Sequence, residues 1–342
     1  MKTLLFMVIP LALMGAACSG DNEPSKPDSK TSGKEISFYA MAPKGTRAPS
    51  TTTATLQDFI VYAFTDSSVI MNGVTVKRNG GSWTYSPVVY WPSSPVDFYA
   101  VSPDIRTGSD MTPDSDEVIR GISCGSTDLL YAVSMNELES LTPVPLTFRH
   151  AMSRVSIMLS STSDRYSVEV YHVSVNNISL TGDFTLPKVN TSDESGLGTW
   201  SGLSASAKTL LYYNMDGAST LLSTTPRDLT EGNLNISFFV PQTLEPLDYS
   251  SGDFTGDFMQ IDCVVKDKST GETVWPNENT PSYLLVAQTD CGRMLFPLAT
   301  PTVTSWQQGY SYVYNVVINK TYSVDTIEFA PVVKDYIVTQ PF

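Results

Sequence analysis

Cysteine and histidine are the side chains that most often bind metals or supply a nucleophile and a base. This chain of 342 residues has four cysteines and two histidines. The cysteines lie at positions 18, 124, 263 and 291, far apart in the sequence, whereas a structural zinc site needs about four converging ligands. The sequence therefore predicts neither a metal nor a cofactor. Cys263 and Cys291 either pair in an exported protein or stay buried as free thiols, and both interpretations remain open.

The two histidines lack the neighbours that catalysis needs. A catalytic histidine works with a nucleophile and an orienting carboxylate, and the sequence identifies neither for His150 or His172. We expect both to be structural, with His150 bonded to the backbone at a domain junction. The chain has no phosphate-binding loop, nucleophile elbow or zinc-protease motif, and no local signal for the paired carboxylates of a glycosidase. The sequence thus predicts a protein that is not an enzyme.

Acidic residues dominate the charge, and the formal net charge is −14. A nucleic-acid partner would require a basic face, so we expect none, and charge also disfavours binding to anionic lipid headgroups. Several acidic residues gather in a loop-like stretch, residues 102–127. A calcium loop of the EF-hand type needs glycine at its sixth position, and counting from Asp114 places Ile119 there. A solvated acidic loop is the better prediction.

Residues 1–18 are predicted to be an export signal. Lys2 precedes an apolar run of about 14 residues, whereas a bilayer-spanning helix needs about 20. The run ends in small residues before Cys18, which resembles a bacterial lipobox, so lipid would be attached to the Cys18 thiol. An ordinary signal peptide with an incidental cysteine is the alternative. Residues 19–34 form a polar tether rich in proline and serine that cannot bury a core.

The rest of the chain is predicted to be all-β. Short segments rich in valine, tyrosine, phenylalanine and threonine alternate with turn signals about every 8–12 residues, which is typical of β-sandwiches. We predict tight turns at residues 65–68, at Asn72-Gly73 and at residues 79–81. The length favours two domains, and we place them at residues 35–150 and 151–342.

The first strand of this body has a clear alternation. Ile36, Phe38 and Ala40 fall on one face of the segment. The strand pattern breaks at Pro43, and a lone Arg47 follows in a flexible tract of small residues. A sheet-forming segment is thus joined to the body by a link that a protease could cut. The alternative is an ordinary first strand followed by a solvated loop.

Aromatic residues concentrate in the stretch that contains Trp83, Tyr85, Tyr90 and Trp91. Such rings could form a platform on which sugars stack. Aromatic residues at strand spacing are more often core or cross-strand pairs, and this is the interpretation that we favour.

Taken together, these features resemble the Bacteroidales fimbrillin-like family, the subunits of type V pili. The resemblance covers most of the chain. It rests on the lipoprotein signal, the early strand ending in Gly-Thr-Arg47-Ala, residues 56–64, Trp83-Thr-Tyr85, Tyr90-Trp-Pro92, residues 96–103, residues 146–154 and Trp306-Gln-Gln-Gly-Tyr310.

The resemblance implies two tandem β-sandwich domains of transthyretin-like topology and a mechanism of assembly. The subunit would reach the surface as an outer-membrane lipoprotein, with the strand of Ile36, Phe38 and Ala40 filling a groove. An arginine-specific protease would cut between Arg47 and Ala48, and the strand would leave. A strand from another fimbrial subunit would then fill the groove by β-strand addition. The candidate donor residues in this chain are Ile327, Phe329, Val332 and Val333.

Other interpretations stay open at this point. Pro331 interrupts the candidate donor, which is alternatively the last strand of its own sandwich. The chain as a whole is alternatively a surface lipoprotein that binds host glycan or protein and never polymerises. The sequence does not distinguish a stalk, tip or anchor subunit.

Overall fold

The computed structural model describes residues 33–41, 56–103, 117–204, 208–215, 217–248, 254–319 and 327–335, with only the backbone described for 208 and for 327–335. Cys18, Arg47 and Ala48 lie outside the described residues. All elements discussed below belong to one compact unit, residues 34–342. These elements are strands, apart from one 3₁₀ turn at Ser282–Leu284, so the predicted all-β class is confirmed. No helix within the described residues is long and apolar enough to cross a membrane.

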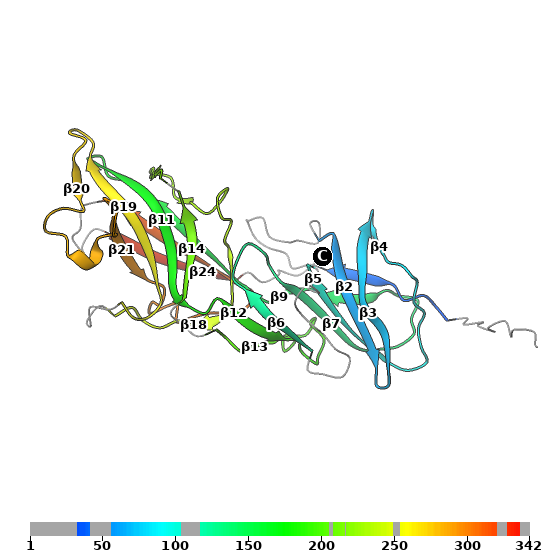
Figure 1. Ribbon diagram of the computed structural model, residues 1–342. Coiled ribbons are helices and arrows are strands. Elements are labelled where there is room, and N and C mark those ends of the chain that lie inside the picture. The colour runs from blue at the N-terminus through cyan, green and yellow to red at the C-terminus, as the bar shows by residue number, and fades with distance from the viewer. Residues whose placement is uncertain are drawn as a thin grey trace, which may run out of the picture. The chain divides into compact units, whose positions relative to one another are not determined.

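A six-stranded antiparallel sheet organises the first part of this unit (Figure 1). Its order is β4-β3-β2-β5-β7-β9. The strands are β2 (Asp58–Thr65), β3 (Ser68–Asn79), β4 (Ser82–Thr84), β5 (Val96–Ser102), β7 (Leu130–Glu137) and β9 (Arg149–His150). The turns predicted at residues 65–68 and 79–81 are confirmed, because Thr65 pairs with Ser68 and Asn79 with Ser82.

The turn predicted at Asn72-Gly73 is wrong. Strand β3 runs straight through these two residues, which lie together opposite Tyr62 as a β-bulge. Gly73 has φ +67°, the left-handed conformation that glycine adopts readily. The same preference that makes this dipeptide a good hairpin turn also makes it a good bulge, and the continuous partner strand β2 selects the bulge.

Both faces of this sheet are covered. Along β2, Phe59, Val61 and Ala63 point into one buried cluster, while Ile60 and Tyr62 point into another. The first face is covered by β1 (Phe38–Met41) and β8 (Val144–Thr147). The second face is covered by a three-stranded sheet, β13-β12-β6, made of β6 (Val118–Ser123), β12 (Thr181–Thr185) and β13 (Thr199–Ser201). The second cover takes residues from both sides of position 150, and the domain boundary there stays a prediction.

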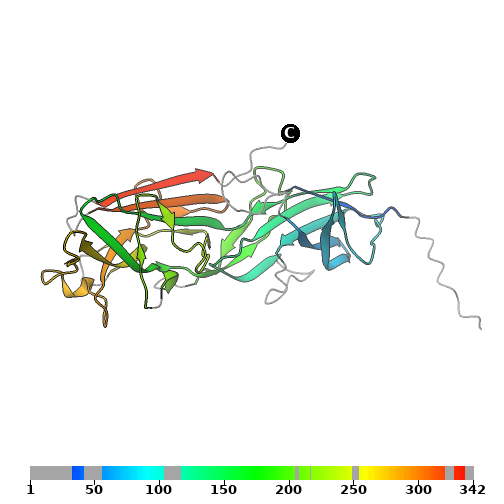
Figure 2. The same ribbon diagram turned by 90° about the horizontal axis from the view of Figure 1, so that it is seen from above.

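Two further sheets enclose the largest buried cluster, which includes Trp275, Trp306 and Tyr314. The first sheet has the order β16-β10-β23-β24 with β17 beside β10, and Figure 2 shows β23 and β24 side by side. Its strands are β10 (Ser153–Ser160), β16 (Arg227–Asp228), β17 (Phe238–Phe239), β23 (Tyr310–Ile318) and β24 (Ile327–Asp335).

The second sheet of this pair has the order β14-β11-β19-β20, with β15 beside β11 and β21 beside β19. Its strands are β11 (Tyr166–Ile178), β14 (Lys208–Asn214), β15 (Thr220–Leu221), β19 (Phe258–Asp267), β20 (Thr273–Trp275) and β21 (Gly292–Pro297). A short pair, β18 (Gln242–Thr243) and β22 (Ser305–Trp306), completes the described strands.

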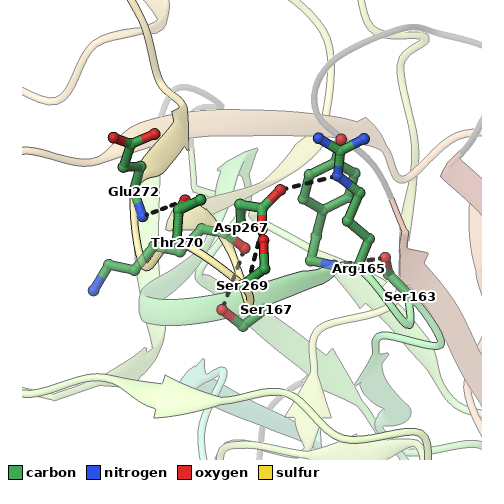
Figure 3. A network of polar contacts seen from close by, with 9 residues as sticks. Ser163, Arg165, Ser167, Asp267, Ser269, Thr270 and Glu272 are labelled. Atoms are coloured by element: carbon green, nitrogen blue, oxygen red, sulfur yellow. Dashed lines mark hydrogen bonds and ion pairs between the residues drawn. The ribbon is translucent and has the colours of Figure 1, made fainter.

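A polar network closes the hairpin between β19 and β20 (Figure 3). Asp267 accepts hydrogen bonds from the backbone and the hydroxyl of Ser269, at 2.8 and 2.5 Å, and one from Arg165 Nε at 2.9 Å. The bonds from Ser269 and then from Arg165 hold the pKa of Asp267 well below its usual value. The bonds from Ser269 close the turn, and the bond from Arg165 ties the turn to the residue before β11, so the network has a structural role.

Candidate functional site

Strand β1 and the residues just before it lie between two other chain segments. On one side, Ile36 N donates to Val89 O and Trp91 N donates to Lys34 O, both at 2.9 Å. On the other side, Val144 N donates to Ser37 O and Phe148 N donates to Met41 O, both at 2.8 Å. We call the space that residues 34–41 occupy between these two edges the strand groove. Backbone hydrogen bonds along both edges give it the character of a slot for one strand.

Strand β1 runs parallel to β8, with Phe38 opposite Val144 and Ala40 opposite Leu146. Because Ser37 and Met41 accept bonds from the β8 side, the odd-numbered residues direct their backbone groups toward β8. The even-numbered residues direct theirs toward the opposite edge, as the bond from Ile36 N to Val89 O shows. Among the described strands, β8 is paired with β1 alone. The departure of β1 would therefore leave β8 without a strand partner.

The predicted alternation of this segment is confirmed. Ile36, Phe38 and Ala40 are 2%, 4% and 3% exposed, whereas Tyr39 between them is 57% exposed. The ring of Phe38 meets the rings of Phe59, Phe98 and Tyr85 at centroid distances of 6.1, 5.8 and 5.7 Å. The two phenylalanine contacts are edge-to-face, a favoured geometry for aromatic pairs. The inward side chains of this segment thus complete the core on this face of the sheet.

Tyr85 also holds the segment of residues 34–41 through a hydrogen bond to its backbone. Its hydroxyl donates to Ile36 O at 2.7 Å, and burial raises the pKa of Tyr85, so the group remains a donor at all physiological pH values. Trp83 packs on Phe59 at 4.9 Å, and Trp91 is 7% exposed. Trp91 is therefore a core residue, Trp83 and Tyr85 are partly buried and pack against the core, as we favoured, and Tyr90 is exposed.

The comparisons with known proteins agree on one family. Residues 31–335 match the sequence pattern of the family described as fimbrillin-like. The chain belongs to the fimbrillin-like family. This membership places it among fimbrial subunits at the cell surface, a structural family whose members associate with other fimbrial subunits.

One solved structure supports the fold of this fimbrillin-like protein. A fimbrial protein of Bacteroides vulgatus ATCC 8482 is 11% identical with a TM-score of 0.53, covering 88% of this chain and 99% of its own. A fimbrilin of Porphyromonas gingivalis W83 is 10% identical with a TM-score of 0.47, covering 90% of this chain and 98% of its own. No curated protein sequence matches this chain.

In this fimbrillin-like protein, the candidate donor segment forms strand β24. Its backbone pairs antiparallel with β23, from Ile318 opposite Ile327 to Tyr310 opposite Asp335. The four predicted donor residues, Ile327, Phe329, Val332 and Val333, all lie within this strand. The structure therefore has the arrangement that the sequence offered as the alternative, a last strand in its own sheet. Whether the strand is donated stays a proposal.

The two histidines of the fimbrillin-like chain each lie beside an aspartate. His150 is buried, and its Nδ1 lies 2.5 Å from Asp128 Oδ2, a side-chain partner that the sequence did not predict. The sequence signal that was missed is the position of Asp128 just before β7, the strand with which β9 pairs. His172 Nδ1 lies 3.7 Å from Asp262 Oδ2. No group of metal-binding side chains gathers within the described part of the chain.

The cysteines of the described residues are free thiols. Cys263 lies opposite Gly292 in the β19–β21 pair, so Cys291 is one residue out of register with it. The ring of Trp275 covers Gly292 so closely that an added Cβ would lie 2.4 Å from it. Burial raises the pKa of the Cys263 thiol well above its usual value and that of Cys124 to about 11. Both thiols therefore stay protonated and unreactive.

Proposed function

We propose that this fimbrillin-like protein is a pilus subunit that is exported as a lipoprotein and polymerises by strand exchange. The observation that carries the proposal is the strand groove, where a short strand completes the core of one sheet face and pairs with β8. Ile36 and Phe38 each contribute about 1.5–3 kcal/mol if fully buried. Such a strand holds the monomer closed while it stays, and leaves an apolar slot with unpaired backbone groups when it goes.

Proteolysis supplies the trigger in this proposal. Lipid on Cys18 anchors the precursor in the outer membrane, and an arginine-specific protease cuts between Arg47 and Ala48. The cut falls in the segment of residues 42–55 that joins β1 to β2. Once this segment is cut, β1 is held only by its hydrogen bonds and side-chain contacts. A strand from another subunit then fills the groove by β-strand addition, with backbone bonds giving affinity and alternate side chains giving register.

The test uses an arginine-specific protease in limiting amounts on the purified protein. We expect a cut at Arg47 to be followed by a ladder of oligomers, measured by native electrophoresis, and the Arg47→Ala variant to stay monomeric. Determination of the N-terminal residue of the protein from cells provides an independent check, with Ala48 expected for the processed subunit. A protein that is cut cleanly and remains a monomer would contradict the proposal.

The second candidate function is a surface lipoprotein that binds host glycan or protein and does not polymerise. The exposed ring of Tyr90 beside the strand groove is the observation in its favour. Its expected signature is binding to a glycan array that survives in the Arg47→Ala variant and is lost in Tyr90→Ala.

A further inference from the structure

The loop that joins β7 to β8, residues 138–143, carries two strongly exposed leucines. Leu141 is 84% exposed, the highest value for any large apolar residue of the described chain, and Leu138 is 60% exposed. We propose that this loop, which we call the leucine loop, rests on a bilayer of zwitterionic lipids beside the lipid anchor. The proposal rests on the proposed function, which places lipid on Cys18, and adds to it a second point of contact with the membrane.

The leucine loop lies beside the point where the predicted tether joins the folded unit. Lys34 Nζ lies 3.8 Å from Oε1 of Glu139, which is within the loop. Just after the loop, Val144 N donates to Ser37 O at 2.8 Å. In the proposed precursor about 16 residues separate the lipid on Cys18 from Lys34, and a flexible chain of that length averages about 20–25 Å from end to end. The anchored lipid therefore keeps this loop close to the bilayer surface.

Hydrogen bonds within the leucine loop hold its shape and satisfy some of its polar groups. Ser140 Oγ lies 2.7 Å from Thr142 Oγ1, and Thr142 N donates to Ser140 Oγ at 3.0 Å. Pro143 lacks an N–H, so the loop has one backbone donor fewer to remove from water. An ordered loop also loses less conformational entropy when it binds. The loop thus presents its two leucines on a turn whose polar groups are partly satisfied.

The charges around the leucine loop select the kind of surface that it can approach. Glu35 and Glu139 are exposed and Glu137 is partly exposed, whereas Lys34 supplies one positive charge. This excess of negative charge is repelled by anionic headgroups, so a zwitterionic bilayer is the matching surface. Tyr90, which forms an isolated bridge with Glu35, adds an exposed ring at the same end of the segment. Tyrosine is favoured at the level of the headgroups.

A membrane suits this patch better than a protein partner does. A stable protein interface buries about 800 Å² on each side around a packed centre, whereas this loop presents two projecting leucines. Burial of one leucine favours the lipid phase by about tenfold or more, which is a weak effect for a free protein. An anchored protein needs no more, because the anchor supplies a high local concentration of membrane and two weak signals together give stable attachment.

Contact at the leucine loop would also orient the precursor for cleavage. A strand rises by about 3.3 Å per residue, so Met41 lies roughly 20 Å along the segment from Lys34. The link that contains Arg47 begins after Met41, at the end of the segment away from the loop. A protease in solution would therefore approach this link at the end that does not contact the membrane.

The experiment measures partitioning of the exported chain, residues 18–342 with Cys18→Ser so that no lipid is attached, onto vesicles of phosphatidylcholine. Sedimentation with increasing amounts of vesicles gives the partition coefficient. We expect Leu141→Asp and Leu138→Asp each to lower it by about tenfold or more, because a carboxylate is costly to place in the apolar layer. Leu221→Asp, at an exposed leucine of β15, is the matched control and should leave it unchanged. Vesicles with added phosphatidylglycerol should bind the native chain more weakly.

Oligomer formation after the arginine-specific cut, followed for the same variants, separates this inference from the proposed function. Loss of partitioning in the two loop variants with an unchanged ladder of oligomers supports the inference. Equal partitioning of all variants, or none for the native chain, would overturn it, while the ladder leaves the proposed function standing. A ladder shortened by Leu141→Asp with unchanged partitioning would also overturn it and assign the loop to a contact between subunits.

Two results bear on the proposed function itself. A native chain that stays monomeric after the cut counts against strand exchange, and the vesicle measurement still decides this inference. A chain from cells that carries no lipid on Cys18 would overturn the proposed export as a lipoprotein and this inference with it.

Discussion

The two faces of the six-stranded sheet are covered by segments that the chain holds in different ways. On one face, the short strand β1 pairs with β8 alone among the described strands. Three inward side chains of this segment complete the buried cluster on that face. On the other face, the strands β6, β12 and β13 cover Ile60 and Tyr62. In the proposed function the first cover is removable and the second is permanent. Both covers bury apolar side chains, so burial alone does not distinguish them.

Several side-chain to backbone bonds that reach across the sheet edge hold the permanent cover. Arg149 Nε donates to Thr191 O at 2.7 Å, and Val133 N donates to Thr191 Oγ1 at 3.0 Å. Trp200 Nε1 donates to Ala151 O at 2.9 Å. Thr191 and Trp200 belong to residues 186–200, which run from the end of β12 into β13. Because β12 stays linked to β11 and β13 stays linked to β14, a single cut between them releases no short strand. In the proposed function, the way each cover is linked to the rest of the chain, more than its packing in the core, therefore decides which cover can be exchanged.

The largest expected effect comes from Phe38→Ala. Loss of this buried ring should lower the free energy of unfolding of the uncut chain by about 3–5 kcal/mol, measured by chemical denaturation. Phe184→Ala on the other face should have a similar effect, because Phe184 packs on Tyr131 and Trp200 at 4.9 and 5.2 Å. Tyr39→Ala is the control and should change stability by less than about 0.5 kcal/mol.

The stability penalties of the two phenylalanine variants should differ after cleavage. Once the cut chain has exchanged β1 for a donor strand, the penalty of Phe38→Ala should vanish while that of Phe184→Ala persists. If Phe38→Ala and Phe184→Ala lowered the stability of the assembled state equally, the two covers would not differ in the way proposed.

Gly198→Ala tests the permanent cover by overpacking. An added Cβ would lie 2.3 Å from Phe184 Cζ and 2.6 Å from Thr185 O. We expect a loss of about 1–3 kcal/mol in the uncut chain and no change in the rate at which β1 leaves after cleavage. Gly125→Ala, where an added Cβ meets nothing within 4 Å, is the matched control. Faster release of β1 in Gly198→Ala would show that the two covers are coupled through the sheet.

Asp257 provides a pH test that should leave both covers unchanged. Burial, with a smaller contribution from Glu245, raises the pKa of Asp257 to about 6. The folded state therefore binds the proton more tightly than the unfolded chain, and the stability from this group falls as pH rises from about 4 to about 6. Asp257→Asn should remove that fall and be more stable than the native chain at pH 8 by roughly 1–2 kcal/mol, with no difference at pH 4.

Thermal unfolding of both proteins across this pH range measures the effect, and release of the β1 peptide from the cut chain should not respond to it. A release rate that follows the titration of Asp257 would argue that the two regions are linked.

Tyr85→Phe should have the smallest effect and should act on the removable cover alone. It deletes the hydrogen bond to Ile36 O and leaves the ring contact with Phe38 in place. We expect a loss of about 0.5–1.5 kcal/mol in the uncut chain and faster departure of β1 after the cut, followed by the fluorescence of a labelled strand. Tyr90→Phe, at an exposed residue nearby, is the control. An equal change in stability and release rate in both variants would show that the Tyr85 hydroxyl does not hold the strand in place.

The sequence by itself determined the features that depend on neighbouring residues. The alternation of Ile36, Phe38 and Ala40 follows from the period of a strand, and the turn at Gly80 follows from its freedom to adopt φ +59°. The all-β class likewise follows from local patterns repeated along the chain.

Tertiary structure decided what depends on distant partners. Only the fold placed Phe38 opposite Val144, joined Asp128 to His150, turned Asn72-Gly73 into a bulge and brought residues 186–200 over the edge of β7. A local pattern can state that a strand has a buried face, but it does not state which segment pairs with that strand, because pairing is set by packing across the whole sheet. The strand groove belongs to this second group.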